Sequence, residues 1–206
     1  MIEVVYRDAD LIAVVKPAGM ATHPSPGHES GTLTDEVKKL FPEIAAVGSA
    51  ERPGVVHRLD AETSGIMVLA RTQAAYLKLR EFFERHDRVE KTYLAVTHGA
   101  PKPQKGVIDE PIDGKRAITR WEVLGRSGDT ALVEFKIETG RTHQIRIHAK
   151  RLGHPIVGDR LYGDAATKRR AKRLLLHAVS LALPHPITGK RMEFTAEVPA
   201  DIVYLV

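Results

Sequence analysis

The sequence predicts an α+β fold, in which a mainly antiparallel mixed sheet is flanked by helices and loops. Strand patterns outnumber helical patterns, and they follow one another in runs instead of alternating with helices. Residues 130–138 alternate apolar and polar side chains, as in a sheet with one solvated face. A doubly wound parallel sheet is therefore not expected. No repeat, low-complexity tract or long linker divides the chain, so we expect residues 1–206 to form a single domain.

The first half of the chain combines strand patterns with two amphipathic helices. The strands are predicted over residues 1–6, 11–16 and 65–70, and the helices over residues 33–41 and 73–85. Pro17 and Gly19 end the second strand, Pro42 stops the first helix, and Thr72 can cap the second helix. The apolar faces expected for the helices comprise Leu33, Val37, Leu40 and Phe41, and then Tyr76, Leu79 and Phe83.

The second half consists mostly of strands. They are predicted over residues 91–97, 107–112, 117–124, 130–138, 174–183 and 192–198. A single helix is expected between Thr142, as its N-cap, and Gly153, as the residue that follows its C-cap.

The composition narrows the class of protein. The chain has 206 residues, and its longest apolar runs, such as residues 11–15, are far too short to span a bilayer. The N-terminal residues lack the basic and apolar pattern of a signal peptide. With no cysteine there is no disulfide, thiolate nucleophile or Cys-ligated metal. We expect a cytoplasmic protein without a membrane partner.

Positive charge is concentrated in one part of the chain. The net charge is +5, but residues 141–173 contain ten Lys or Arg against Asp159 and Asp164 alone. That stretch therefore carries +8, and the remainder sums to −3. A one-sided basic surface suits a polyphosphate partner such as RNA, although a solubilising face is the alternative.

A polar segment, residues 57–65, leads directly into the predicted strand at 65–70 and is a candidate for catalysis. It places Asp60 between Arg58 and Glu62. In the alternative, the segment is a turn in which the side chains of Asp60 and Thr63 bond to local backbone groups. A protein-kinase interpretation fails, because the metal-binding Asn and the Asp-Phe-Gly motif are missing.

A second candidate segment, residues 140–148, turns into the helix of the second half. Its two histidines are five residues apart, which is a poor match to a zinc helix, so no metal site is expected. Arg141, His143 and Arg146 instead provide donors for phosphates or for an anionic side chain. An exposed basic helix is the alternative.

A tyrosine in the predicted strand at 91–97 is the third candidate. Tyr93 shares a strand face with Lys91 and Ala95, and its ring can stack on a nucleobase. A lone aromatic residue on a strand is more often a core residue, which is the alternative. Composition and spacing thus indicate a basic, RNA-facing domain with an Asp–Arg–Tyr site, but they do not define the reaction.

These segments resemble the RluA family of pseudouridine synthases along almost the whole chain. Six stretches match in order and at compatible spacing: Val15–Gly19, His57–Gly65, Lys91–Val96, Gly140–His148, Leu152–Asp159 and Leu174–Ala178. The resemblance implies the pseudouridine-synthase catalytic fold. It also implies isomerisation of uridine in ribosomal or transfer RNA by a cofactor-free, metal-free enzyme, in which the base flips out of its stack.

The resemblance further implies roles for individual residues. Asp60 matches the essential aspartate, Arg146 the arginine that pairs with it, and Tyr93 the tyrosine that stacks on the uracil. Arg58 matches an arginine that, in some relatives, fills the gap left by the flipped nucleotide, and Leu175 lies in the apolar pocket lining. His57, Arg141 and His143 lie in the same motifs and are expected to contribute to substrate binding.

Two departures from the family concern RNA specificity. The first motif begins near residue 15, so we expect no separate N-terminal RNA-binding module, and the span 111–115 looks shorter than the usual hairpin. The basic cluster at residues 168–173 is expected to supply RNA affinity instead. We expect a monomer. Two other functions stay open: a non-catalytic RNA-binding factor, and a hydrolase using Asp60 and Glu62 as a carboxylate pair.

Overall fold

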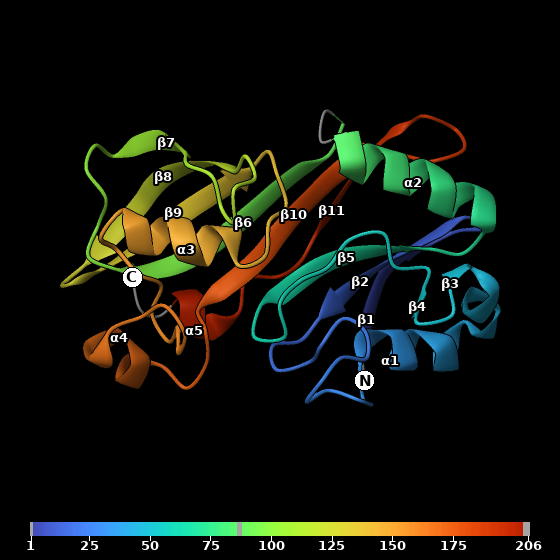
Figure 1. Ribbon diagram of the computed structural model, residues 1–206, viewed down its shortest axis with the longest axis horizontal. Helices are drawn as coiled ribbons and strands as arrows, with labels where there is room; N and C mark the ends of the chain where they lie inside the picture. The colour runs from blue at the N-terminus through green and yellow to red at the C-terminus, as the bar shows by residue number, and fades with distance from the viewer. Residues whose placement is uncertain (1, 86–87, 204–206) are drawn as a thin grey trace. The chain divides into compact units, whose positions relative to one another are not determined.

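The computed structural model describes residues 2–85 and 88–203, which form two compact units (Figure 1). The first unit takes its described residues from segments 1–89 and 180–196, and the second from segments 90–179 and 197–206. Strands outnumber helices in both units, so the α+β prediction is confirmed. Within 2–85 and 88–203, each helix is too short or too polar to cross a bilayer.

The first unit contains the strands β1 (Glu3–Arg7), β2 (Leu11–Lys16), β5 (Ser64–Ala70) and β11 (Arg191–Thr195). β10 (Leu176–Pro184) passes from the second unit into the first between residues 179 and 180. The hydrogen-bonded order is β1-β2-β5-β10, and β11 pairs with β10. Residues of β2 and β5 are almost all buried, so the loop that precedes β5 leads into a rigid strand. The predicted strand at 11–16 is confirmed, whereas Met1 lies outside the described residues.

The helices of the first unit are α1 (Leu33–Leu40), the short 3-10 helix η1 (Pro42–Ala46) and α2 (Gln73–Arg85). A small hairpin, β3 (Gly48–Ser49) with β4 (Arg52–Pro53), follows η1. Thr32 and Asp35 form a reciprocal capping box that starts α1. The predicted cap of α2 is confirmed, since Thr72 Oγ1 accepts from Ala75 N at 3.2 Å. The apolar face predicted for α1 is wrong at Leu40, which is 50% exposed because the helix ends there and Phe41 turns inward.

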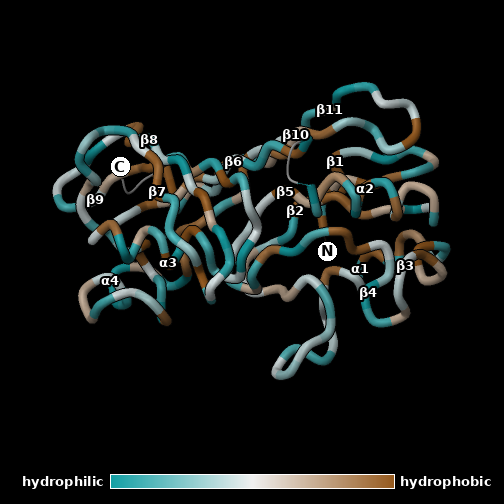
Figure 2. Tube along the Cα trace, turned by 45° about the horizontal axis from the view of Figure 1, so that its top comes forward, coloured by the Kyte–Doolittle hydropathy of each residue, from teal (hydrophilic) through white to brown (hydrophobic). Residues whose placement is uncertain are grey.

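The second unit is built on the strands β6 (Glu90–His98), β9 (Thr130–Ile137), β8 (Ile118–Ser127) and β7 (Lys105–Asp109). Their order, starting from β10, is β10-β6-β9-β8-β7, and the pairs β6–β9, β9–β8 and β8–β7 are antiparallel. The alternation predicted for β9 is confirmed, because Ala131, Val133, Phe135 and Ile137 are all buried. Hydrophobic and hydrophilic segments alternate along the chain in Figure 2.

The helices of the second unit are α3 (Gln144–Arg151), α4 (Ala165–Arg170) and α5 (Ala200–Val203). The N-cap of α3 is His143, with a left-handed φ of 55°, and not the predicted Thr142. The predicted C-terminal glycine is confirmed: Gly153 has a φ of 82° directly after the C-cap. Helix α4, which Asp164 caps, escaped prediction because its six residues are too few and too polar to show an apolar period.

The predicted strand at 107–112 is displaced in the structure. β7 ends at Asp109, because Pro111 has no N–H to donate and Asp113 and Gly114 adopt positive φ values in a tight turn. The isolated bridge between Ile112 and Lys115 closes this turn. The last two strands are also shorter than predicted, since β10 begins at Leu176 and β11 ends at Thr195.

Gly158 is expected to tolerate no side chain. Its φ is +79°, and a Cβ there would lie 1.9 Å from the carbonyl oxygen of Arg173. Gly158→Ala should lower the free energy of unfolding by at least about 2 kcal/mol, through left-handed strain and backbone displacement. Chemical denaturation measures this loss. Gly153→Ala is the matched control, with a similar φ of +82° but nothing within 4 Å of the new Cβ. Equal losses in the two variants would contradict the clash.

Candidate active site

Asp60 lies half-buried in a turn between β4 and β5, and backbone contacts hold this turn on both sides. Thr63 N donates to Asp60 O at 3.0 Å, which closes the turn. Thr22 Oγ1 donates to Leu59 O at 2.9 Å and accepts from Leu59 N at 3.3 Å. The main chain on either side of Asp60 is therefore fixed, so its carboxylate is presented from a rigid base.

A buried lysine anchors the other side of this turn. Lys16 is fully buried, and its Nζ donates to the carbonyl oxygens of Pro17 (3.0 Å), Met20 (2.7 Å) and Ala61 (3.1 Å). Ala61 O also accepts from Gly19 N at 2.8 Å. Burial lowers the pKa of Lys16 to about 7, although the charge of Asp60 acts in the opposite direction. These three bonds fasten loop 17–20 to the Asp60 turn.

Lys16→Met should destabilise the protein, because it leaves the carbonyl oxygens of Pro17 and Met20 without their donor and that of Ala61 with the Gly19 amide alone. We expect a loss of about 1–3 kcal/mol in the free energy of unfolding at pH 9. The folded pKa is about 7 and the ordinary value is 10.5, so the unfolded chain binds more protons between these pH values. Wild-type stability therefore gains from Lys16 as pH rises across this window, and the difference from Lys16→Met should widen. Urea denaturation at several pH values tests this, and a difference that stays constant would contradict it.

The remaining residues of the Asp60 segment divide into exposed and anchored side chains. Arg58 is exposed, as an RNA contact requires. His57 Nε2 accepts from Val68 N at 3.1 Å, and its ring stacks on Phe83 with 4.4 Å between ring centroids. These contacts hold His57 against β5 and α2, so its substrate contact stays a prediction. Thr63 Oγ1 is buried with no hydrogen-bond partner among the described residues, which removes Thr63 from the local-turn alternative.

In the second unit, Arg146 forms a bidentate ion pair with Asp159. Arg146 Nε donates to Asp159 Oδ2 and Arg146 Nη2 to Asp159 Oδ1, both at 2.8 Å, and the two side chains are 4% and 1% exposed. Oδ1 also accepts from the backbone N of Leu161 and Tyr162 at 2.9 Å. Burial alone would raise the pKa of Asp159, but the bonds from Arg146 and these amides hold it below its ordinary value. The predicted pairing of Arg146 with Asp60 joins residues of different units and stays a prediction.

The Tyr162 ring also lies beside Arg146. The guanidinium carbon lies 5.3 Å from the centre of the Tyr162 ring, and Tyr162 OH lies 3.0 Å from His143 Nδ1. Neither Asp159 nor Tyr162 was singled out from the sequence. The available signal was one of only two carboxylates in a basic region, which follows an apolar stretch and lies three residues before a tyrosine.

Two other side chains of the segment 140–148 fasten α3 to β8. Gln144 Oε1 accepts from Thr139 Oγ1 at 2.7 Å, while Gln144 Nε2 donates to Ile118 O and Thr119 Oγ1 at 2.9 and 3.0 Å. His148 Nδ1 lies 2.8 Å from Thr119 Oγ1, and burial lowers the pKa of His148. These bonds fix the helix that contains Arg146. They give Gln144 and His148 a structural role.

Tyr93 and Leu175 are both buried in the second unit. Tyr93 is opposite Phe135 in the β6–β9 pair. Leu175 packs in a core cluster with Val96, Val157 and Ile202. This packing fixes their positions, whereas their contacts with a uracil base stay predictions.

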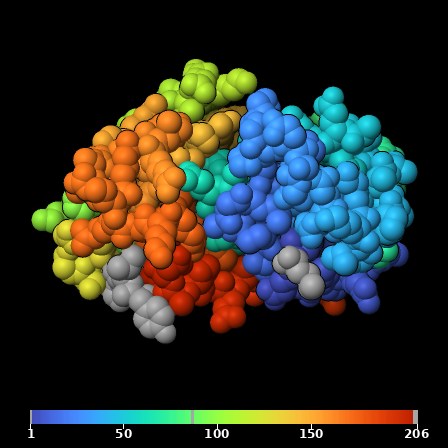
Figure 3. All heavy atoms as spheres, turned by 90° about the horizontal axis from the view of Figure 1, so that it is seen from below, coloured from blue at the N-terminus to red at the C-terminus, as the bar shows by residue number. Residues whose placement is uncertain are grey.

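The basic cluster at residues 168–173 is partly neutralised by ion pairs. Arg170 pairs with Asp129, and Arg173 pairs with Asp201 at 2.5 Å. Lys168, Arg169 and Lys172 are exposed, and the orange atoms that include α4 form a continuous part of the surface in Figure 3. The positive charge that this cluster can offer to RNA is therefore smaller than its residue count suggests.

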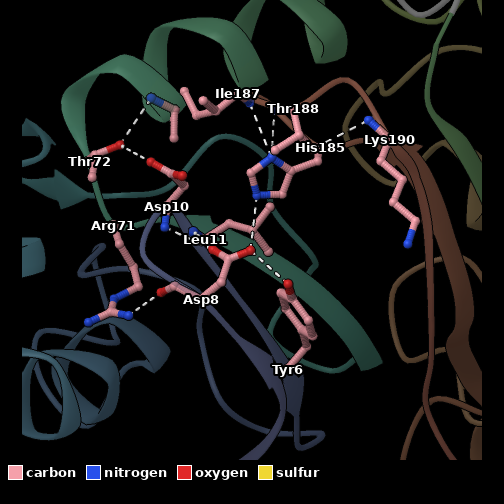
Figure 4. Close-up of polar contacts among 11 residues, drawn as sticks. Tyr6, Asp8, Asp10, Leu11, Arg71, Thr72, His185, Ile187, Thr188 and Lys190 are labelled. Atoms are coloured by element: carbon pink, nitrogen blue, oxygen red, sulfur yellow. Dashed lines mark hydrogen bonds and ion pairs between the residues drawn. The ribbon is translucent and has the colours of Figure 1, made fainter.

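Asp8, Asp10 and His185 of the first unit have the composition of a cation site (Figure 4). His185 Nδ1 accepts from the two backbone amides of residues 187 and 188, so Nε2 carries the hydrogen that is donated to Asp8 Oδ2 at 2.9 Å. Tyr6 OH donates to the same oxygen at 2.7 Å, and Thr72 Oγ1 donates to Asp10 Oδ1 at 3.1 Å. The cluster therefore links the β10–β11 hairpin to the β1–β2 turn, and these bonds account for its composition.

The chain is similar to known proteins over almost its whole length. Residues 10–151 match the family described as RNA pseudouridylate synthase. The chain is 44% identical to an uncharacterised RNA pseudouridine synthase of Chloroflexus aurantiacus, over 91% of this chain and 63% of that protein. It is 35% identical to the ribosomal large subunit pseudouridine synthase D of Zymomonas mobilis, over 99% of this chain and 71% of that protein. The chain thus spans about two thirds of these relatives.

Solved structures agree with the comparison of sequences. The human protein RNA Pseudouridylate Synthase Domain Containing 4 is similar with a TM-score of 0.80 at 28% identity. The similarity covers 98% of this chain and 91% of that structure. It confirms the fold predicted from the resemblance.

Proposed function

The chain belongs to the RNA pseudouridylate synthase family, and we propose that it isomerises specific uridines of ribosomal or transfer RNA to pseudouridine. In this reaction the bond from ribose C1′ to uracil N1 breaks and a bond from C1′ to C5 forms. C5 loses its hydrogen as a proton to water and N1 takes up a proton, so the product is an isomer and no oxidant or reductant is required. The observation that carries the proposal is the Asp60 turn, which Lys16, Thr22 and Thr63 hold from both sides.

In the proposed mechanism Asp60 acts on the ribose of a flipped uridine, either as a nucleophile at C1′ or as a base. Arg146, oriented by Asp159, stabilises the negative charge of the Asp60 carboxylate. Tyr93 holds the detached uracil by stacking while the base turns. Arg58 fills the gap that the flipped nucleotide leaves, which offsets part of the unstacking cost of a few kcal/mol.

Further parts of the proposal concern the substrate and its setting. Arg141, His143 and His57 contact the RNA, and Leu175 forms the apolar wall of the uracil site. The two units act together as one catalytic domain, which works as a monomer in the cytoplasm without metal or cofactor. The exposed charges of residues 168–173 contribute to RNA affinity.

The release of tritium from RNA labelled at uracil C5 tests the proposed function. Purified protein is incubated separately with ribosomal and transfer RNA from cells that lack it, because such RNA contains the unmodified target. We expect release from at least one pool, together with pseudouridine and no free uracil. Free uracil would favour the hydrolase that uses Asp60 and Glu62. Binding of both pools without release would favour a non-catalytic RNA-binding factor.

A further inference from the structure

The second unit contains a buried lysine whose charge has little compensation. Lys91 is 8% exposed on β6, and within residues 2–85 and 88–203 its Nζ has one hydrogen-bond contact, at 3.5 Å to Thr139 O. Lys16 provides a direct comparison, since its Nζ has three carbonyl partners between 2.7 and 3.1 Å. A buried ammonium group is costly unless it is paired. Two of the three Lys91 donors are therefore available for a ligand.

The charged group that acts on the pKa of Lys91 is also positive. Burial first, and then the Arg141 guanidinium, lower the pKa of Lys91 to about 8. The backbone next to Arg141 lies close to Lys91, because a Cβ built on Gly140 would lie 3.9 Å from Lys91 Nζ. Two neighbouring cations, one of them buried, raise the energy of the unliganded protein, and an anion between them would lower it.

The Arg141 turn is held in place before any ligand binds. Arg141 N donates to Gln144 Oε1 at 3.0 Å, and Arg141 Nε donates to Arg116 O at 3.0 Å. The first turn of α3 contains no acidic residue, and its N-cap His143 makes no side-chain capping bond. The positive end of the helix therefore adds to the field of the two cations.

We infer that Lys91 and Arg141, at the start of α3, bind a phosphate group of the RNA backbone beside the reacting uridine. Phosphate is favoured because it is the anion that RNA presents next to every base. Tyr93, which stacks on the uracil in the proposed mechanism, lies two residues from Lys91 on the same strand face. The identity of the anion rests on the proposed function, whereas the uncompensated cation does not.

Lys91→Met tests this site in the tritium-release assay, with the RNA pool from which the wild type releases tritium. We expect KM to rise about 10- to 100-fold, as for the loss of a charge-assisted bond, with a smaller change in kcat. Substrates carrying one uncharged methylphosphonate, placed in turn on either side of the uridine, identify the phosphate. At the correct position the wild type should lose the same factor, and Lys91→Met should lose nothing further. Independent losses at both positions would overturn the inference.

Stability separates binding from a structural role. Lys91→Met should unfold at the same or a higher denaturant concentration than the wild type, because it removes a poorly paired buried charge. This is the opposite of the result expected for Lys16→Met. Destabilisation comparable to that of Lys16→Met, with KM unchanged, would show that Lys91 is structural. Lys105→Met, at an exposed lysine of the same unit, is the matched control and should alter neither quantity.

Equilibrium binding distinguishes failure of this inference from failure of the proposed function. If the wild type releases no tritium, the isomerase proposal falls, but RNA affinity can still be measured as a function of salt. Lys91→Met should reduce the slope of log affinity against log salt by about one, as for the loss of one phosphate contact. An unchanged slope, in a folded variant, would overturn the phosphate site even if the enzyme is active.

Discussion

Asp60→Asn should abolish tritium release, with a fall in kcat on the order of 10⁴-fold or more. An amide can neither attack C1′ nor take up a proton, so both versions of the mechanism lose their reactive group. The variant should keep the turn, because the contacts that hold it are made by the backbone of residues 59 to 63. Thr22, Lys16 and Gly19 all bond to that backbone.

Two measurements make the Asp60→Asn result specific. The free energy of unfolding should stay within about 1 kcal/mol of the wild-type value, and RNA should still bind. Glu62→Gln changes the neighbouring carboxylate two residues away and should retain most of the activity. Equal inactivation by Glu62→Gln would instead support a carboxylate pair and hydrolysis. Undiminished release by Asp60→Asn would remove the basis of the proposed function.

Local sequence signals predicted the elements whose boundaries are set by a neighbouring proline or capping residue. The bounds of β2 and α2 follow from Pro17 and Thr72, and the buried face of β9 follows from simple alternation. Prediction was wrong where the deciding contact is tertiary or the element is short. The N-cap of α3 is His143 and not Thr142, and the next residue, Gln144, bonds to Ile118 and Thr119 of β8.

The motifs indicated which side chains were chemically important but not how they are supported. Nothing local shows that Lys16 reaches Ala61, 45 residues further on, or that Arg146 pairs with Asp159. Lysine is usually exposed, so the burial of Lys16 and Lys91 was unexpected from their residue type. Burial and pairing depend on which distant segments pack together, and a single sequence does not specify this.

Asp159→Ala should cause the largest loss of stability among the variants considered. It leaves the Arg146 guanidinium buried without the carboxylate that takes two of its bonds, at a cost of about 3–5 kcal/mol in the free energy of unfolding. Urea denaturation measures this loss. Asp129→Ala is the matched control, because its pair with Arg170 is exposed and should be worth less than about 1 kcal/mol. Similar losses in the two variants would contradict the assigned burial.

The same ion pair predicts a separable effect on catalysis. In Asp159→Asn the shape is kept but the charge is lost, so Arg146 is less firmly oriented. We expect kcat to fall about 10- to 100-fold with little change in KM. Replacing both partners, in Asp159→Leu with Arg146→Met, should recover much of the stability that Asp159→Ala loses, because the buried guanidinium and the buried carboxylate are then removed together. Activity should not return with it, since the variant lacks the arginine that we propose as the partner of Asp60. If activity did return with stability, Arg146 would serve folding alone.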